Sequence, residues 1–160
     1  MAHAKDVVAD QLLANANDPS WYLPFSDSVK DVSEEAAFWK PSEDCNSIAE
    51  LTQHLIYWNE TWQTRYIEND VQAVPSIGDN NKSFLIPENH TFAMLKEKLL
   101  EVLLKWQPLL SEEKVASNVQ GFGEPVSWWA VLGNVSTRNA FHIGQIVYIR
   151  KLYKSHGEGQ

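Results

Sequence analysis

Residues 47–62 read SIAELTQHLIYWNETW and carry the clearest helical signal in the chain. Ser47 and Glu50 match a capping box, in which the serine hydroxyl accepts a backbone N–H and the glutamate reaches back to the serine N–H. Apolar residues then recur at three- and four-residue spacing: Ile48, Leu51, Leu55, Trp58 and Trp62. This spacing predicts an amphipathic helix to about Asn69, with a wide aromatic face.

Three further segments have helical spacing: residues 6–17, a stretch that begins near Thr91, and residues 127–153. The last is apolar on almost every side, so we expect it to be buried. Residues 70–90 between the second and third helices predict a loop much longer than the usual ~4–6 residues. Since few stretches alternate with period two, the sequence predicts an all-α four-helix bundle with a long crossover between helices two and three.

Prolines break up the first 40 residues. Asp18 and Pro19 suit an N-cap and a first helical position, and an apolar stripe then extends to Val32. We expect Pro24 to kink this helix or to delay its start. A short helical turn is expected at residues 33–41.

Length and composition fit a single globular domain spanning residues 1–160. The chain has 44% hydrophobic residues, which excludes disorder and fibrous repeats. Its 13 basic and 21 acidic residues give a net charge of −8, which argues against nucleic acid and anionic membranes as partners. No signal peptide and no apolar run of ~18 residues are visible, so we expect a soluble, cytoplasmic protein that does not enter a membrane. The one cysteine, Cys45, excludes an intrachain disulfide and lies in a predicted loop.

Two histidines lie among apolar residues inside predicted helices, His54 in the second and His142 in the last. A single buried histidine is usually a core residue with one hydrogen bond, but two on different helices of one bundle suggest a shared metal or cofactor site. Neutral imidazole suits Zn or Ni. A third ligand is expected one turn before or after His142. One turn before stands Arg138, whose permanent cation would repel a divalent ion.

The chain lacks the common nucleophile, phosphate-loop, dinucleotide-binding and zinc-protease motifs. It has seven tryptophans, more aromatic area than the core of one bundle needs. Some of these, Trp58 among them, are therefore expected to line a cleft for a small-molecule ligand, and others could form a homodimer through helix faces.

The segment Asn139–Ile146, with His142, Gly144 and Gln145, resembles the H-x-x-x-H-x-G-Q hallmark of the DinB-like superfamily. Residues 47–55 resemble the other hallmark of that family, a histidine in the second helix after a Ser-Ile start. The resemblance spans nearly the whole chain. It implies a four-helix bundle, often dimeric, in which three histidines commonly hold a divalent metal ion.

Some members of that family are transferases that act with thiols such as bacillithiol or mycothiol, and maleylpyruvate isomerase is a relative. His54 and His142 match two ligand positions of the family, and the third falls on Arg138. Two hypotheses follow for this chain. One is a metal-dependent transferase or hydrolase that acts on a thiol. The other is a degenerate metal site, with Zn or Ni bound weakly or not at all, whose cleft binds a small ligand through Arg138, Trp58 and Gln145.

Overall fold

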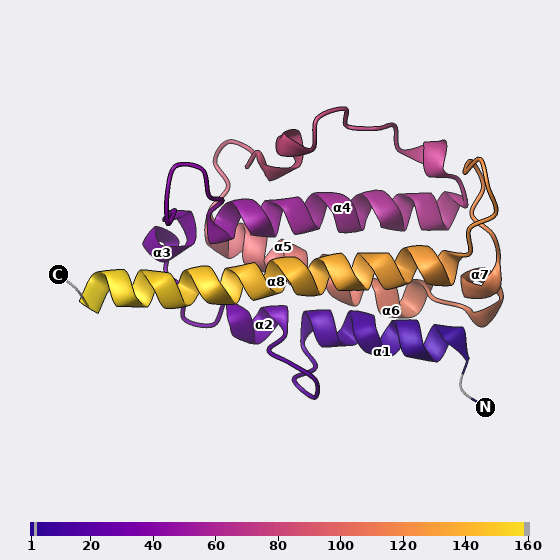
Figure 1. The fold of residues 1–160 in the computed structure, drawn as a ribbon, viewed down its shortest axis with the longest axis horizontal. Helices are drawn as coiled ribbons and strands as arrows, with labels where there is room; N and C mark the ends of the chain where they lie inside the picture. Colours follow the sequence, from indigo (N-terminus) through magenta and orange to yellow (C-terminus); the bar gives the residue numbers. More distant parts are fainter. Residues whose placement is uncertain (2, 159–160) are drawn as a thin grey trace.

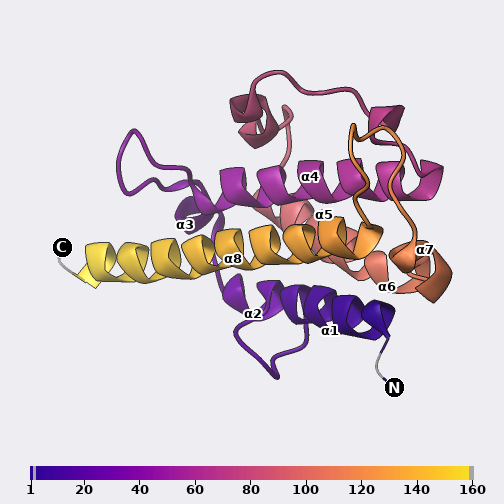
Figure 2. The ribbon, with the colours of Figure 1, turned by 45° about the vertical axis from the view of Figure 1, so that its right-hand side comes forward.

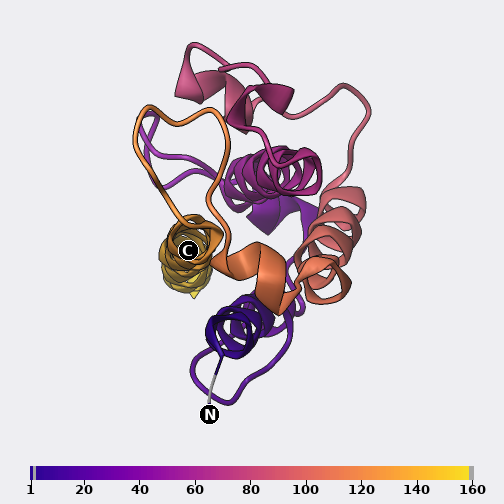
Figure 3. The same ribbon diagram turned by 90° about the vertical axis from the view of Figure 1, so that its right-hand side faces the viewer.

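The computed structural model describes residues 1 and 3–158, and four long helices lie side by side in it (Figure 1). They are α1 (Ala4–Ala16), α4 (Ile48–Glu68), α5 (Phe92–Leu104) and α8 (Trp128–Glu158). The α4 helix packs against α5 and α8, and α1 packs against α8 and α5, which closes the ring seen end-on in Figure 3. The predicted all-α four-helix bundle is confirmed.

Short helices connect and cover the long ones. They are α2 (Phe25–Ser28), α3 (Glu34–Phe38), η1 (Val71–Ala73), η2 (Asn80–Phe84), α6 (Trp106–Leu109) and α7 (Glu112–Ala116). Within the described residues there is no strand, and only two isolated β-bridges occur, Asp70–Gln120 and Asn118–Ser127. No helix in this part of the chain has the length and apolar character that crossing a membrane requires.

The predicted capping box starts α4. The Ser47 hydroxyl accepts the Glu50 backbone N–H at 3.1 Å, and the Glu50 carboxylate accepts the Ser47 N–H at 2.7 Å. At the other end Asn69 adopts the left-handed conformation, with φ 54°, and ends the helix. Sequence and structure therefore agree on both ends of α4.

The predicted crossover links α4 to α5 and contains η1 and η2 (Figures 1 and 2). It runs over the outer side of α4, as the two views show. At its end Thr91 caps α5, and the Glu34 carboxylate accepts the backbone N–H groups of Phe92 and Ala93 at 2.8 and 3.0 Å. A carboxylate at a helix N-terminus is favourable, so α3 is joined electrostatically to α5.

The predicted helix over residues 18–32 is wrong for most of its length. Asp18 does not cap a helix, because its carboxylate accepts both the backbone N–H and the hydroxyl of Ser20 and so closes a turn. The helix starts only at Phe25, directly after Pro24, and ends at Ser28. Trp21 lies outside any helix and is 66% exposed.

The expectation that the last helix is buried on all sides is also wrong. Trp129, Phe141 and Tyr148 on α8 are 53, 63 and 65% exposed. Within the described residues α8 packs mainly against α1 and α4, with smaller contacts to α2 and α7, and one side of this 31-residue helix is not covered by a long helix. An apolar composition on all sides therefore did not mean burial on all sides.

Two hydrophobic clusters form the core, one on each side of a polar layer. One cluster contains Leu55 and Ile143, and the other contains Tyr66 and Val135. Between them, along α4 and α8, lie buried asparagines.

Candidate functional site

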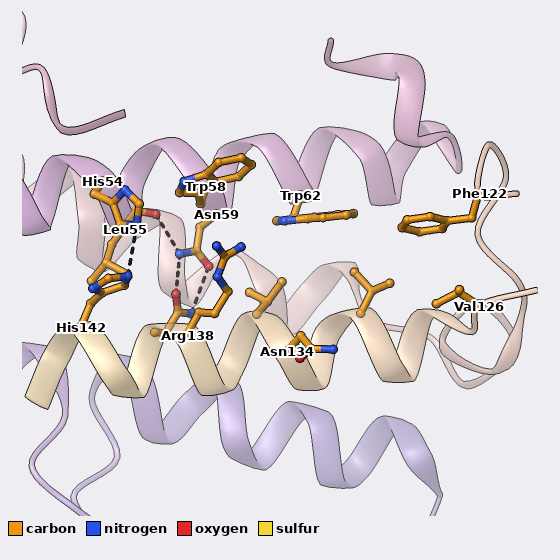
Figure 4. Close-up of a pocket in the computed structure, with 13 residues that line it drawn as sticks. His54, Leu55, Trp58, Asn59, Trp62, Phe122, Val126, Asn134, Arg138 and His142 are labelled. Atoms are coloured by element: carbon orange, nitrogen blue, oxygen red, sulfur yellow. Dashed lines mark hydrogen bonds between the residues drawn. The ribbon is translucent and has the colours of Figure 1, made fainter. Parts of the chain in front are cut away.

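Two histidines from different helices face each other in the interior (Figure 4). His54 comes from α4 and is 3% exposed, and His142 comes from α8. Their Nε2 atoms lie 3.1 Å apart, and the rings meet edge to face at 79°. The structure therefore brings together the two histidines that the sequence singled out.

The hydrogen bonds around this pair fix the positions of its protons. Ser83 donates its hydroxyl proton to the Asn80 carbonyl at 2.6 Å, so His54 Nδ1, 2.6 Å from the same hydroxyl, must donate to it. The Nε2 atom of a neutral His54 then carries a lone pair and faces His142 Nε2. His142 Nδ1 lies 2.7 Å from the Gln145 Oε1 atom and donates to it, so the Nε2 atom of a neutral His142 also carries a lone pair.

Burial keeps both rings neutral. It lowers the pKa of His54 to about 4, with smaller contributions from His142 and from the Arg138 cation. Burial also lowers the pKa of His142, and Arg138 adds to this, whereas the hydrogen bond with Gln145 opposes it. Near pH 7 both rings are therefore neutral.

Arg138 lies beside the pair, and its guanidinium carbon is 5.5 Å from the centroid of the Trp58 ring, a cation–π arrangement. No carboxylate of the described residues forms an ion pair with Arg138. The Trp58 indole N–H donates to the Asn80 side chain at 3.1 Å, which holds the ring in place. The cleft thus contains a cation that rests on an aromatic surface and has no anion of its own.

The cavity next to these residues has a volume of about 220 Å³. Figure 4 shows Trp62, Phe122 and Val126 extending its wall away from the histidines. Phe122 and Val126 come from the loop that precedes α8, so this loop closes the far end. The cavity is polar and cationic at one end and apolar at the other.

Asparagines form the floor. Asn59 donates to Asn139 at 2.8 Å and accepts the indole N–H of Trp106 at 2.9 Å. Asn139 donates to Asn15 at 3.2 Å, and Asn15 donates to the Ser136 carbonyl at 3.3 Å. All three asparagines are buried, so a satisfied polar network ties α1, α4, α6 and α8 together beneath the cavity.

The crossover covers the histidine end. Phe84 stacks on His54 with the ring centroids 4.0 Å apart and the planes 6° apart. Together with the bonds of Ser83 and Asn80, this fixes η2 over the site. Sequence analysis missed Ser83 and Phe84, because nothing in a loop sequence shows which helix the loop covers. The sequence did contain a signal for Asn59. It is a polar residue within the apolar stripe of α4, four residues after Leu55 and three before Trp62.

Gln145, the remaining predicted ligand contact, does not line this cavity. It lies one turn beyond His142, bonds to that ring, and lines a separate groove that also contains Cys45. Among the described side chains no group of three or more His, Cys, Asp and Glu residues could hold a metal ion. Glu60, a carboxylate on the same helix as His54, instead pairs with Lys98 at 3.1 Å.

A divalent metal ion fits this donor set only in part. The separation of 3.1 Å between the Nε2 atoms is close to the ~3.3 Å that two tetrahedral ligands at ~2.0–2.1 Å from one ion require. A catalytic zinc site normally needs a third protein ligand, and Arg138 lines the cleft where that ligand is expected. The residues present therefore do not complete a three-ligand metal site.

Comparisons with known proteins agree with this fold. A family model described as the DinB superfamily matches residues 25–146. A crystal structure of a DinB-like protein from Bacillus subtilis, YjoA, superposes with a TM-score of 0.67 at 16% identity, over 91% of this chain and 92% of that chain. At this identity the likeness concerns the fold alone. No curated protein matches the chain.

Proposed function

This chain belongs to the DinB superfamily, and on that premise we propose that its cleft binds a small organic anion in place of a catalytic metal ion. One observation carries the proposal. Arg138 lines the cavity beside the two neutral histidines, and no described carboxylate neutralises it. Arg138 is exposed to solvent at this cavity, where its guanidinium can bind an anionic group of a ligand through charge-assisted hydrogen bonds.

The guanidinium suits a carboxylate or a phosphate. It can donate two parallel N–H bonds to either group while its face remains on Trp58. His142 and His54 are neutral, so they do not compete with Arg138 as cations for the anionic group of the ligand. Arg138 is the anchor in this proposal.

The rest of the cavity favours a ligand with an apolar body. Its far end is lined by Trp62, Phe122 and Val126, and its volume of about 220 Å³ restricts the ligand to a compact molecule. A flat apolar group could rest on these aromatic side chains while its anionic group reaches Arg138. We therefore propose a compact carboxylate with an aromatic or aliphatic body as the ligand class. Separately, we propose a cytoplasmic location for the protein.

Calorimetry with phenylacetate and uncharged phenylacetamide tests this proposal. We expect phenylacetate to bind the wild type, phenylacetamide to bind at least tenfold more weakly, and Arg138→Gln to abolish the difference. Lys154→Gln removes a cation from the same helix outside the cavity and should leave phenylacetate binding unchanged. Equal binding of the two compounds to the wild type would refute the role of Arg138.

A second candidate is a divalent-metal-dependent thiol transferase or hydrolase. The observation that favours it is the distance of 3.1 Å between the two Nε2 atoms, which suits two ligands of one ion. Metal analysis of protein purified without a metal-affinity column separates the candidates. Stoichiometric Zn or Ni would support the enzyme, whereas weak or absent metal would support the anion-binding cleft.

A further inference from the structure

Two unprotonated imidazole nitrogens face each other at the cationic end of the cavity. The proton of His54 lies on Nδ1, which donates to the Ser83 hydroxyl. The proton of His142 also lies on Nδ1, which donates to Gln145 Oε1. Each Nε2 atom therefore carries a lone pair, and the two atoms lie 3.1 Å apart. No other donor of the described residues forms a hydrogen bond with either lone pair.

The protein itself thus leaves two acceptors at this point without a donor. His54 is 3% exposed, so solvent has little access to its ring. A buried acceptor that lacks a donor is destabilising, and two lone pairs at this distance also repel each other. Both rings line the cavity, as Figure 4 shows, so a molecule bound there can supply the missing donor.

The charge of Arg138 decides which kind of donor suits the pair. Arg138 stands one helical turn before His142 and lines the same cavity. Burial lowers the pKa of both rings, and the Arg138 cation lowers it further. An environment that disfavours a proton on either ring also disfavours an ammonium group or a divalent cation between them. A neutral hydroxyl has a proton to donate and carries no such penalty.

The geometry connects this hydroxyl to the anionic group of the ligand. Arg138 and His142 lie four residues apart on one face of α8, so a carboxylate bound to Arg138 holds the adjoining carbon of the ligand near the histidine pair. A hydroxyl oxygen on that carbon can lie at a hydrogen-bond distance of about 2.8 Å from both Nε2 atoms, because these are 3.1 Å apart. Its proton then bonds to one lone pair at a time.

We propose that the ligand of the cleft is a 2-hydroxycarboxylate with a compact apolar body, whose carboxylate binds Arg138 and whose hydroxyl donates to the Nε2 atoms of His54 and His142. This inference rests on the proposed anion-binding function and adds the chemical class of the ligand to it. The hydroxyl takes the place between the histidines that a metal ion would need, in a donor set that does not complete a three-ligand metal site.

Calorimetry on protein freed of metal ions with EDTA compares three compounds that differ at one carbon. Mandelate is phenylacetate with a hydroxyl beside the carboxylate, and α-methoxyphenylacetate keeps that oxygen but lacks its proton. We expect one enantiomer of mandelate to bind at least about tenfold more tightly than phenylacetate, because unpaired acceptors gain a donor. We expect no such gain for α-methoxyphenylacetate.

The outcomes separate this inference from the proposed function. Phenylacetate that binds as tightly as mandelate would refute the role of the hydroxyl and leave the role of Arg138 standing. Phenylacetate that binds no better than phenylacetamide would refute the role of Arg138, and the inference would fall with it.

Variants test the contact with the histidines. The preference for mandelate over phenylacetate should decrease in His142→Phe and vanish in the double variant His54→Phe/His142→Phe, while phenylacetate still binds through Arg138. His90→Phe, at an exposed histidine outside the cavity, is the matched control and should keep the full preference. Thermal unfolding checks that each variant is folded. A full preference in the folded double variant would contradict the proposed contact.

Nitrogen NMR of the imidazoles at pH 7 provides a measurement that needs no variant. The free protein should show both Nε2 atoms unprotonated, and mandelate should shift their resonances more than phenylacetate does, since only mandelate donates a hydrogen bond to them. A His142 that is protonated at Nε2 in the free protein, or equal shifts with the two ligands, would overturn the inference.

Discussion

The Nε2 atoms of His54 and His142 lie 3.1 Å apart, although 88 residues separate the two histidines in the chain. Neither ring faces a carboxylate, and both pKa values are lowered mainly by burial. The pair is therefore neutral at pH 7.

The stability of the metal-free protein should fall below pH 6.5. In the folded state the pKa of His54 is about 4, compared with 6.5 when the group is exposed. The contribution of the neutral, buried His54 to the free energy of unfolding is thus fully present above pH 6.5 and is lost as pH falls toward 4. At ~1.4 kcal/mol per pH unit the loss amounts to up to about 3 kcal/mol. Urea unfolding at pH 7, 6 and 5 measures it, and the same slope in His54→Gln would contradict the assignment.

Arg138→His should create a metal site. The new imidazole would stand four residues before His142 on the same face of α8, and three nitrogens would then converge with His54. Removal of the guanidinium also removes its repulsion of a dication. We expect the affinity for Zn or Ni to rise by orders of magnitude over the wild type in calorimetry. Tight stoichiometric metal in the wild type, lost in His142→Ala, would show that the arginine does not oppose metal binding.

Asn139→Ala should destabilise the fold by about 2–4 kcal/mol. The change leaves the buried Asn15 Oδ1 atom without its partner and removes one of the two acceptors of the Asn59 amide nitrogen, which keeps the Leu55 carbonyl. Asn134→Ala, at an exposed position five residues earlier on α8, is the control and should stay within about 0.5 kcal/mol of the wild type. Denaturant unfolding compares the two. Equal stabilities would mean that the asparagine layer contributes nothing.

Ser83→Ala should change the tautomer of His54. The hydroxyl is the partner of His54 Nδ1, and without it nothing favours the proton on that nitrogen. Nitrogen NMR of the imidazoles at pH 7 should show Nδ1 protonated in the wild type and a mixture in the variant. Ser76→Ala, in an exposed part of the same crossover, should leave the spectrum of His54 as it is in the wild type.

The local elements with strong start and stop signals could be read from the sequence. Ser47 and Glu50 start α4 through contacts within four residues, so no tertiary information was needed. Asp18 had a similar signal, but its carboxylate satisfies Ser20 in a turn instead of capping a helix. Short-range hydrogen bonds allow both outcomes for an aspartate, and the sequence does not distinguish between them.

The apolar periodicity of α8 likewise did not determine which sides of the helix are buried. An apolar helix can be buried or can present part of its surface to solvent, and the exposed Phe141 and Tyr148 show the second case. The choice depends on how many neighbours surround the helix. That number is a property of the bundle and not of the helix.

The sequence by itself determined the helices, the long crossover, the acidic surface charge and the two histidines at helical positions that face inward. Periodicity and capping act over a few residues, and net charge is a sum, so none of these depends on the arrangement in space. The tertiary structure alone decided that His54 meets His142, that Ser83 and Phe84 cover them, and that Gln145 lies outside the cavity. These contacts join residues from different elements, and their geometry depends on helix packing and on the path of the crossover, which no local pattern encodes.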